Sequence, residues 1–379
     1  MSKLNNSVIL VDAFDIRLNS RSKTEIAYLL QAGYNVQIIC RNFQNNSVPK
    51  QIEVGEHKVT VSWYNGKRQD GANSSIKALL RFWWFTFKIL FKNRKGLFAV
   101  QACNFGAAPG AFIFTRIFFR KKFVYSIHDL YTHLHPVTSV KLAHYINIGE
   151  AIVAKKATLT ILAHDGQLQW LKGIKFKHEP IIIYPSPVGK SIENKNIKLN
   201  PNNLSFCQLG SQTGIRFTTE LLDIFSNNPN WHIIFAGNAG AISNIKSYAA
   251  RFPNIKYIGS IPHEKALEIQ QNTDIMISMI HPTPGAVRYP HKYFEAMQLG
   301  KPIIVSAGSA ASKDAEKLNY GFVSEYNKEH FVQTVKKQVL TADIKALDEH
   351  ARRLFDTQYS GNIMAKRLSD AYGNLSNKI

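Results

Sequence analysis

The feature that most constrains the fold of this 379-residue chain is a regular alternation of short strand-like runs with segments of helical periodicity. Short apolar runs rich in Val, Ile and Phe are typical of buried strands in a parallel sheet, and the segments between them suit crossover helices. The runs are SVILVDAF, YNVQIIC, KVTVSWY, LFAVQAC, KKFVYSIHDL and ATLTILAH in the first half, and LSFCQLG, WHIIFAG, IKYIGS, DIMISMI and KPIIVS in the second. The pattern predicts an α/β chain of two Rossmann-like, doubly wound domains.

The domain boundary is expected in the segment IIIYPSPVGKSIENKN, where prolines, a glycine and a polar run interrupt the periodicity. We therefore expect an N-terminal domain over residues 1–185 and a C-terminal domain over 190–355, with a last helix at about 360–379 that packs back on the first. Open parallel sheets bind ligands beyond the carboxyl ends of their strands, so we expect functional residues in the loops that follow the runs, at a cleft between the domains.

Charge and cysteine content narrow the function classes. The formal net charge is +21, with 47 basic and 26 acidic side chains, which indicates nucleic acid, an anionic membrane surface or phosphorylated substrates as partners. The three cysteines are widely spaced and lack metal-ligand spacing, so we expect a reducing compartment and buried, inert thiols. The N-terminus does not resemble a signal peptide, and no apolar run approaches the roughly 20 residues that span a bilayer.

Residues 76–95 form a basic, aromatic segment with helical periodicity. Its cations lie on one stripe and its aromatic residues lie beside them; they are Lys77, Arg81, Lys88 and Lys92 with Trp83 and Trp84. This pattern favours a helix lying in an anionic membrane interface, and residues 112–123 repeat the chemistry. The alternative is a core helix whose lysines reach one wet edge. Single-stranded nucleic acid also suits basic and aromatic residues, but no nucleic-acid motif accompanies them, and we expect no such partner.

The segment HPTPGAVRYPHKYFEAMQLGKPIIVS predicts a short helix in the expected C-terminal domain. Pro290 suits the first helical position, and Gly300 followed by proline suits the stop, so the helix should span about 290–299. Arg288, Lys292 and Glu295 are spaced by roughly one turn. A cation in the first turn is disfavoured by the helix dipole, which indicates a bound anion. The alternative is an ordinary solvated face.

Three other strand ends carry candidate chemistry. In SIHDL, His128 and Asp129 follow a first-domain strand and offer a proton acceptor and a charge; the alternative is a surface turn. The segment QLGSQTGIRFTTELLDIF places a glycine-containing loop, with Gly210 and Arg216, between a strand and a helix, as in phosphate-binding loops. FAGNAG, with Gly237, marks a second glycine-containing strand end.

In sequence order, LGSQTGIR, FAGNAG, YIGSIPHEKALEIQQNTDIMISMI and YPHKYFEAMQLGKPIIVS together resemble the retaining GT-B glycosyltransferases of the family-4-like group, mainly over residues 205–325. DIRLNSRSKTEIAYLLQAGYNVQIIC and SIHDL look like the acceptor-side elements. The resemblance implies a UDP- or GDP-linked sugar donor and a reaction without a metal or other cofactor. Glu295 would accept hydrogen bonds from the ribose, and Lys292 would lie near the diphosphate.

The resemblance also implies roles for the remaining candidates. The donor site would comprise Gly210, Arg216, Gly237, Arg288, Lys292 and Glu295, the catalytic residues would be His128, Asp129 and Arg216, and Arg17 and Arg21 would contact a phosphate or the acceptor. The chain departs from the family pattern at Val287, where many relatives carry an earlier glutamate, and in having one clear cation, Arg216, where they carry a basic pair.

These observations predict transfer of a sugar, with retention, to a lipid-linked or polysaccharide-precursor acceptor. We expect a cytoplasmic protein attached peripherally to the inner face of the membrane. Two alternatives stay open. One is a catalytically silent GT-B subunit that binds a partner transferase, which Val287 favours. The other is a nucleotide-sugar epimerase of the same fold.

Overall fold

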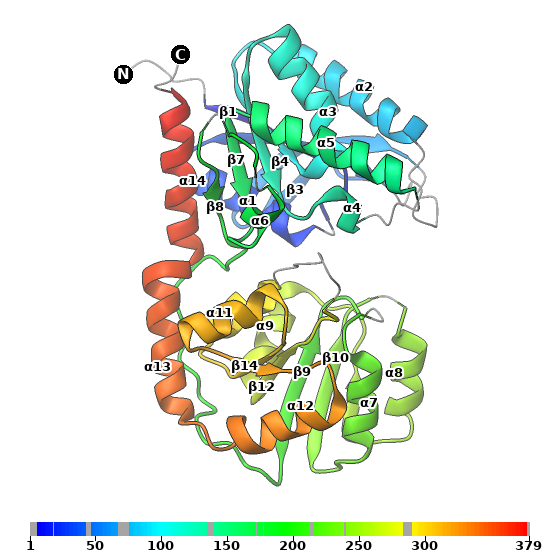
Figure 1. The fold of residues 1–379 in the computed structure, drawn as a ribbon, viewed down its shortest axis with the longest axis vertical. Coiled ribbons are helices and arrows are strands. Elements are labelled where there is room, and N and C mark those ends of the chain that lie inside the picture. The colour runs from blue at the N-terminus through cyan, green and yellow to red at the C-terminus, as the bar shows by residue number, and fades with distance from the viewer. Residues whose placement is uncertain are drawn as a thin grey trace. The chain divides into compact units, whose positions relative to one another are not determined.

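The computed structural model describes residues 6–17, 19–42, 47–66, 76–134, 139–171, 173–176, 178–212, 215–238, 240–282 and 290–376. The chain forms two compact units, one comprising residues 1–185 and 361–379 and the other residues 186–360 (Figure 1). The C-terminal segment therefore belongs to the first unit by its contacts. Each unit has its own hydrophobic core and its own sheet.

The sheet of unit 1 has the order β3-β4-β2-β1-β5-β6-β7-β8 in the described residues. Its strands are β1 (Ser7–Asp12), β2 (Asn35–Asn42), β3 (Gln51–Val54), β4 (His57–Asn65), β5 (Leu97–Cys103), β6 (Lys122–Ile127), β7 (Leu159–Leu162) and β8 (Ile181–Ile182). All neighbours pair in parallel except β3 and β4, which form a hairpin. Sequence analysis missed β3, which is mostly exposed, and β8, which lies in the segment expected to be the domain boundary.

The helices of unit 1 cover both faces of its sheet. They are α1 (Ser20–Gln31), α2 (Ile76–Lys92), α3 (Asn104–Phe112), the π-helix η1 (Ile113–Phe118), α4 (Tyr131–Leu134), α5 (Val140–Lys156), α6 (Gln167–Trp170) and α14 (Gly361–Ser376). Right-handed crossovers put α2, α3 and α5 on one face, where α3 packs against both of the others. On the other face, α14 packs beside α1 (Figure 1).

One side of helix α2 packs in the core of unit 1, and the other side exposes both basic and apolar side chains. Leu79, Phe82 and Leu90 are buried in the unit 1 core. Gly110 of α3 lets the helices approach closely, because a Cβ there would lie 2.8 Å from the Cα of Trp83. The indole nitrogen of Trp83 donates to the carbonyl of Gly106, so Trp83 faces α3 rather than the exposed surface expected for it.

The sheet of unit 2 has the order β11-β10-β9-β12-β13-β14, with all neighbours parallel. Its strands are β9 (Leu204–Leu209), β10 (Trp231–Ala236), β11 (Ile255–Tyr257), β12 (Ile275–Ser278), β13 (Ile303–Ser306) and β14 (Phe322–Ser324). Its helices are α7 (Thr218–Ser226), α8 (Ile242–Ala249), α9 (His263–Asn272), α10 (His291–Gln298), α11 (Ala310–Leu318), α12 (Lys328–Thr334), η2 (Val335–Val339), α13 (Ile344–Leu354) and η3 (Phe355–Tyr359). This is the Rossmann strand order, so the predicted doubly wound class is confirmed for unit 2, although β14 was missed.

The expected burial of the cysteines is confirmed: Cys40, Cys103 and Cys207 are free thiols in the protein interior. The predicted helix over 290–299 is also confirmed within one residue at each end, since α10 spans His291–Gln298 with Pro290 as its N-cap. Among the described residues, no helix combines the length and apolar character needed to cross a membrane.

Lys301, which lies between α10 and β13, is an ammonium group buried in the core of unit 2. Its side chain is 1% exposed, and its Nζ makes no hydrogen bond with any described residue. Burial disfavours the charged form and lowers the pKa of Lys301 to about 8, despite the opposing charges of Asp274 and Asp348. The folded state therefore binds fewer protons than the unfolded chain between about pH 8 and the ordinary lysine pKa of 10.5.

Lys301→Met is expected to stabilise unit 2 by up to about 3 kcal/mol at pH 7, because a charged lysine there is destabilising below its folded pKa. The gain over wild type should shrink as pH rises from 8 and vanish above about 10.5. Denaturant unfolding at pH 7 and pH 10 measures this, with exposed Lys317→Met as the matched control. Equal stability of the Lys301 variant and wild type at pH 7 would contradict the prediction.

Candidate functional site

In both units, the sheet reverses its strand order at one point, and this switch point is where open α/β sheets bind ligands. In unit 2 the switch lies between β9 and β12, and in unit 1 it lies between β1 and β5. The residues that follow these strands are Gly210 and Met279 in unit 2, and Ala13 and Asn104 in unit 1. Most of the predicted site residues lie in loops or helix starts beside these positions.

Gly210 and Gly237 bring the ends of β9 and β10 into backbone contact. Both have positive φ, +115° and +127°, and a Cβ on Gly237 would lie 1.8 Å from the carbonyl oxygen of Gly210. Their N–H groups are already used, since Gly210 donates to Ala236 and Gly237 donates to Gly259. The two glycines therefore shape the loop, and their own amides are not free for a phosphate.

Arg216 lies on a loop that is fixed on both sides. The carbonyl of Ile215 accepts from the backbone of His281, which follows β12, and the N–H of Phe217 donates to the hydroxyl of Tyr326 at 2.7 Å. Phe217 has φ +58°, a left-handed conformation that costs a non-glycine residue about 1–3 kcal/mol and persists where the surroundings enforce it. These contacts hold Arg216 beside the carboxyl ends of β9 and β12.

Glu295, in the first turns of α10, is a buried carboxylate. It is 5% exposed and accepts from Lys292 and from Gln270 of α9, both at 2.7 Å. Burial would raise the pKa of Glu295, but the charge of Lys292 and the hydrogen bonds more than offset this, and its pKa lies below the ordinary value. Within the described chain both bonds end on Oε2, so the ionised carboxylate keeps Oε1 for another donor.

Glu295 is thus more buried than we expected for a donor-site residue in a cleft. Lys292 forms an ion pair with Glu295. Arg288 and Val287 lie outside the described residues. The structure brings Lys292 and Glu295 together as the one-turn spacing predicted.

His128 and Asp129 lie directly after β6, in a turn that Asn104 holds in place. The side-chain oxygen of Asn104 accepts the backbone N–H of His128 at 2.7 Å and that of Asp129 at 3.2 Å. Asn104, which follows β5, has φ +61°. His128 is 5% exposed, so its imidazole is largely enclosed.

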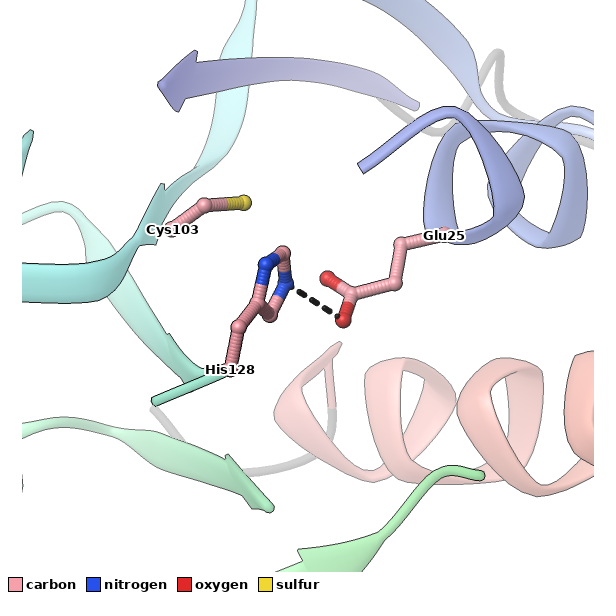
Figure 2. A group of neighbouring side chains, drawn as sticks. All are labelled: Glu25, Cys103 and His128. Atoms are coloured by element: carbon pink, nitrogen blue, oxygen red, sulfur yellow. Dashed lines mark hydrogen bonds and ion pairs between the residues drawn. The ribbon is translucent and has the colours of Figure 1, made fainter. Parts of the chain in front are cut away.

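A buried glutamate that the sequence analysis missed contacts His128. Glu25 of α1 lies with an oxygen 3.0 Å from His128 Nε2 (Figure 2), and its other partners are Ser126 and Gln101. Burial would raise the pKa of Glu25, but His128 and the nearby Arg21 more than offset this and lower it. The signal available in the sequence was an acidic residue on the apolar stripe of an amphipathic helix.

Glu25, His128 and Cys103 have donor atoms within 4.8 Å of one another, as a metal site would need (Figure 2). Their chemistry fits a hydrogen-bonded cluster better. Burial, together with Glu25 and Asp12, holds the pKa of Cys103 well above its ordinary value, so the thiol keeps its proton. The carboxylate of Glu25 already accepts three hydrogen bonds.

The two arginines expected to contact a phosphate differ in their surroundings. Arg17 makes a two-pronged ion pair with Asp15, at 2.9 and 2.6 Å, and lies over the ring of Trp63. Arg21 is 3.8 Å from Glu25, and its Nε and Nη2 are buried without a hydrogen-bond partner among the described residues. Arg21 therefore has unused donors, whereas Arg17 is engaged.

No protein-family model matches the chain, and no curated protein matches it. Solved structures do match its fold. Sucrose-phosphate synthase from Thermosynechococcus elongatus has a TM-score of 0.71 at 14% identity, covering 99% of this chain and 100% of that one. A glycosyltransferase from Rickettsia africae has a TM-score of 0.68 at 16% identity, covering 98% and 99%. Anabaena HepE in complex with UDP has a TM-score of 0.68 at 12% identity, covering 97% and 100%. The predicted GT-B fold is confirmed.

Proposed function

We propose that the chain transfers a sugar from a nucleotide diphosphate donor to an acceptor, with retention. The observation that carries this proposal is the ionised, buried Glu295 of α10, whose Oε1 accepts no hydrogen bond from any described residue. Ribose hydroxyls are donors that suit such a carboxylate. HepE, which shares the fold, is described as a complex with UDP and with UDP-glucose, and this supports UDP over GDP as the carrier.

The mechanism follows from where positive charge lies in unit 2. As the bond between the sugar and the diphosphate breaks, negative charge grows on the departing phosphate. Arg216, held by the β9–α7 loop, and Lys292 at the start of α10 would stabilise that charge, which lowers the barrier to an oxocarbenium-like transition state. In unit 1, His128 and Asp129 would hold the acceptor hydroxyl, and Arg21 would contact an anionic group of the acceptor.

Nucleotide binding tests the donor site directly. UDP or UDP-sugars are expected to raise the melting temperature of the wild-type protein above the effect of GDP and ADP. Glu295→Gln, which keeps the shape of the side chain, is expected to weaken UDP binding by about 1.5–3 kcal/mol, since a charge-assisted hydrogen bond is lost. Glu295→Ala is expected to lower stability as well, because Lys292 and Gln270 lose their partner.

Calorimetric titration of each folded variant with UDP measures the change in UDP affinity. Unchanged UDP affinity in Glu295→Gln would contradict the assigned donor site. Nucleotide binding without any sugar transfer or hydrolysis would favour a catalytically silent subunit that binds a partner transferase. Conversion of a nucleotide sugar without an added acceptor would favour an epimerase.

We further propose that the acceptor is a lipid-linked or polysaccharide precursor at an anionic, cytoplasmic membrane surface. The exposed side of α2 carries Lys77, Arg81, Lys88 and Lys92 together with Leu80, Trp84 and Phe91, and Trp84 is 59% exposed. On the same sheet face, η1 exposes Ile117 and Phe118, and α5 exposes Tyr145 and Ile152. Residues 76–123 contain no Asp or Glu. Apolar side chains among cations, without acidic residues, suit anionic lipid headgroups.

Neutralising this surface is expected to weaken membrane binding. Replacing Lys77, Arg81, Lys88 and Lys92 by Gln should cost roughly 1 kcal/mol per charge on anionic vesicles, and binding of wild type should fall with added salt. A matched control removes four exposed lysines of unit 2, Lys195, Lys198, Lys313 and Lys317. Vesicle sedimentation measures both. Equal losses in the two variants, or no wild-type binding at low salt, would contradict the membrane proposal.

A further inference from the structure

Glu25 is an ionised carboxylate in the interior of unit 1, and a buried charge needs partners to be tolerated. It lies on the core stripe of α1 with Ser22, Ile26 and Leu29, and it is 2% exposed. An apolar residue at this position would pack without any desolvation cost. The partners of Glu25 therefore indicate what the charge does.

Every hydrogen bond that Glu25 makes within the described chain is one that it accepts. Oε1 accepts from the hydroxyl of Ser126 at 2.8 Å and lies 3.0 Å from His128 Nε2, and Oε2 accepts from the amide of Gln101. An ionised carboxylate cannot donate, so Nε2 of His128 must carry a proton. In the neutral ring, Nδ1 is then the only nitrogen that accepts a hydrogen bond.

The same hydrogen bonds extend to the C-terminal helix. The hydroxyl of Tyr372, on α14, donates to the side-chain oxygen of Gln101, and this fixes the amide of Gln101 with its nitrogen toward Glu25. Tyr372 and Gln101 are fully buried. A chain of hydrogen bonds thus runs from α14 through β5 and α1 to the residue after β6, joining segments far apart in the sequence.

We propose that Glu25 is a positioning residue that sets the tautomer and the ring orientation of His128, with Gln101 and Tyr372 holding Glu25 in place. In Figure 2 the carboxylate of Glu25 faces one ring nitrogen, and the other nitrogen is turned away from it. This other nitrogen, Nδ1, lies on the side of Cys103, and in the Nε2–H tautomer it is the ring nitrogen that can accept a hydrogen bond. The catalytic part of this inference rests on the proposed sugar transfer, whereas the tautomer does not.

Glu25→Gln tests the proposal. Its amide nitrogen competes for the position facing His128, so the Nε2–H tautomer should lose population, which nitrogen-15 NMR of the histidine side chains detects. The rate of transfer at saturating donor should fall about tenfold or more, with the KM for the nucleotide sugar unchanged, because the two ring nitrogens exchange their donor and acceptor roles in the other tautomer. Tyr372→Phe, which removes only a hydroxyl, should shift the tautomer in the same direction by a smaller amount.

The control is Glu150→Gln, which alters another buried carboxyl group of unit 1. Glu150 accepts hydrogen bonds from the hydroxyl of Tyr125 and the backbone N–H of Tyr131. This variant should leave the His128 tautomer and the rate as in wild type. A folded Glu25→Gln variant with the wild-type tautomer would overturn the proposal, and so would a shifted tautomer with the wild-type rate.

If Glu25→Gln does not fold, the tautomer and the rate of Tyr372→Phe are judged by the same two criteria. Absence of transfer by wild type would contradict the proposed function instead, while the NMR result would still decide whether Glu25 sets the tautomer.

Discussion

Gly237→Ala is expected to be among the most destabilising small substitutions in unit 2, at roughly 4 kcal/mol or more. The added Cβ would lie 1.8 Å from the carbonyl oxygen of Gly210 and 2.6 Å from its carbonyl carbon. Backbone atoms cannot move aside as a flexible side chain can, because both lie at ends of paired strands. The φ of +127° adds strain that only glycine avoids.

The control for this prediction is Gly240→Ala, three residues along the same loop, where a new Cβ would meet nothing within 4 Å. Denaturant unfolding of the two variants, followed by circular dichroism, gives the comparison. Gly240→Ala should stay close to wild type. Similar stability of the two variants would show that β9 and β10 do not approach as closely as the structure describes.

His128→Ala is expected to lower sugar transfer by about 10²–10⁴-fold while unit 2 still binds the nucleotide. The imidazole belongs to unit 1, and the donor contacts of Arg216 and Glu295 belong to unit 2. Arg216→Ala should instead reduce nucleotide affinity and rate together, because the same cation holds the diphosphate and stabilises its departure.

Calorimetry with UDP and product mass after incubation with donor and acceptor separate these effects. Asp129→Asn is expected to behave like His128→Ala, and His57→Ala, at an exposed histidine of unit 1, serves as the control. Transfer at the wild-type rate by the His128 and Asp129 variants would identify SIHDL as a turn held by Asn104, without a catalytic role.

The local pattern predicted most of the regular structure. Each strand-like run in the sequence became a strand, and the signals at Pro290 and Gly300 marked the bounds of α10 within a residue. These predictions succeeded because strand and helix periodicity, proline and glycine act over a few neighbouring residues. The strands β3, β8 and β14 lie at sheet edges and are only partly buried, so they lack the continuous apolar run that marked most of the predicted strands.

The candidate site was predictable only in part. The spacing of Lys292 and Glu295 on one helix implied that they meet, and they do. Nothing local implied that Gln270 of α9 also bonds Glu295. Nor did any local pattern imply that Arg17 pairs with Asp15, while Nε and Nη2 of Arg21 have no hydrogen-bond partner in the part of the chain that the structure describes. Trp83 and Trp84 are adjacent in sequence, yet Trp83 donates a hydrogen bond to α3 and Trp84 is exposed. The reason is that successive residues of a helix point about 100° apart.

The sequence by itself determined the doubly wound class, the glycines at the strand ends and the basic, acid-free character of residues 76–123, since each is a property of neighbouring residues. Only the tertiary structure decided which polar groups share the interior. Glu25 and His128 are separated by 103 positions, and Tyr372 lies 271 positions from Gln101. Such pairs form when sheet order and helix packing bring distant segments together, and burial then makes each unpaired polar group costly enough to select its partner.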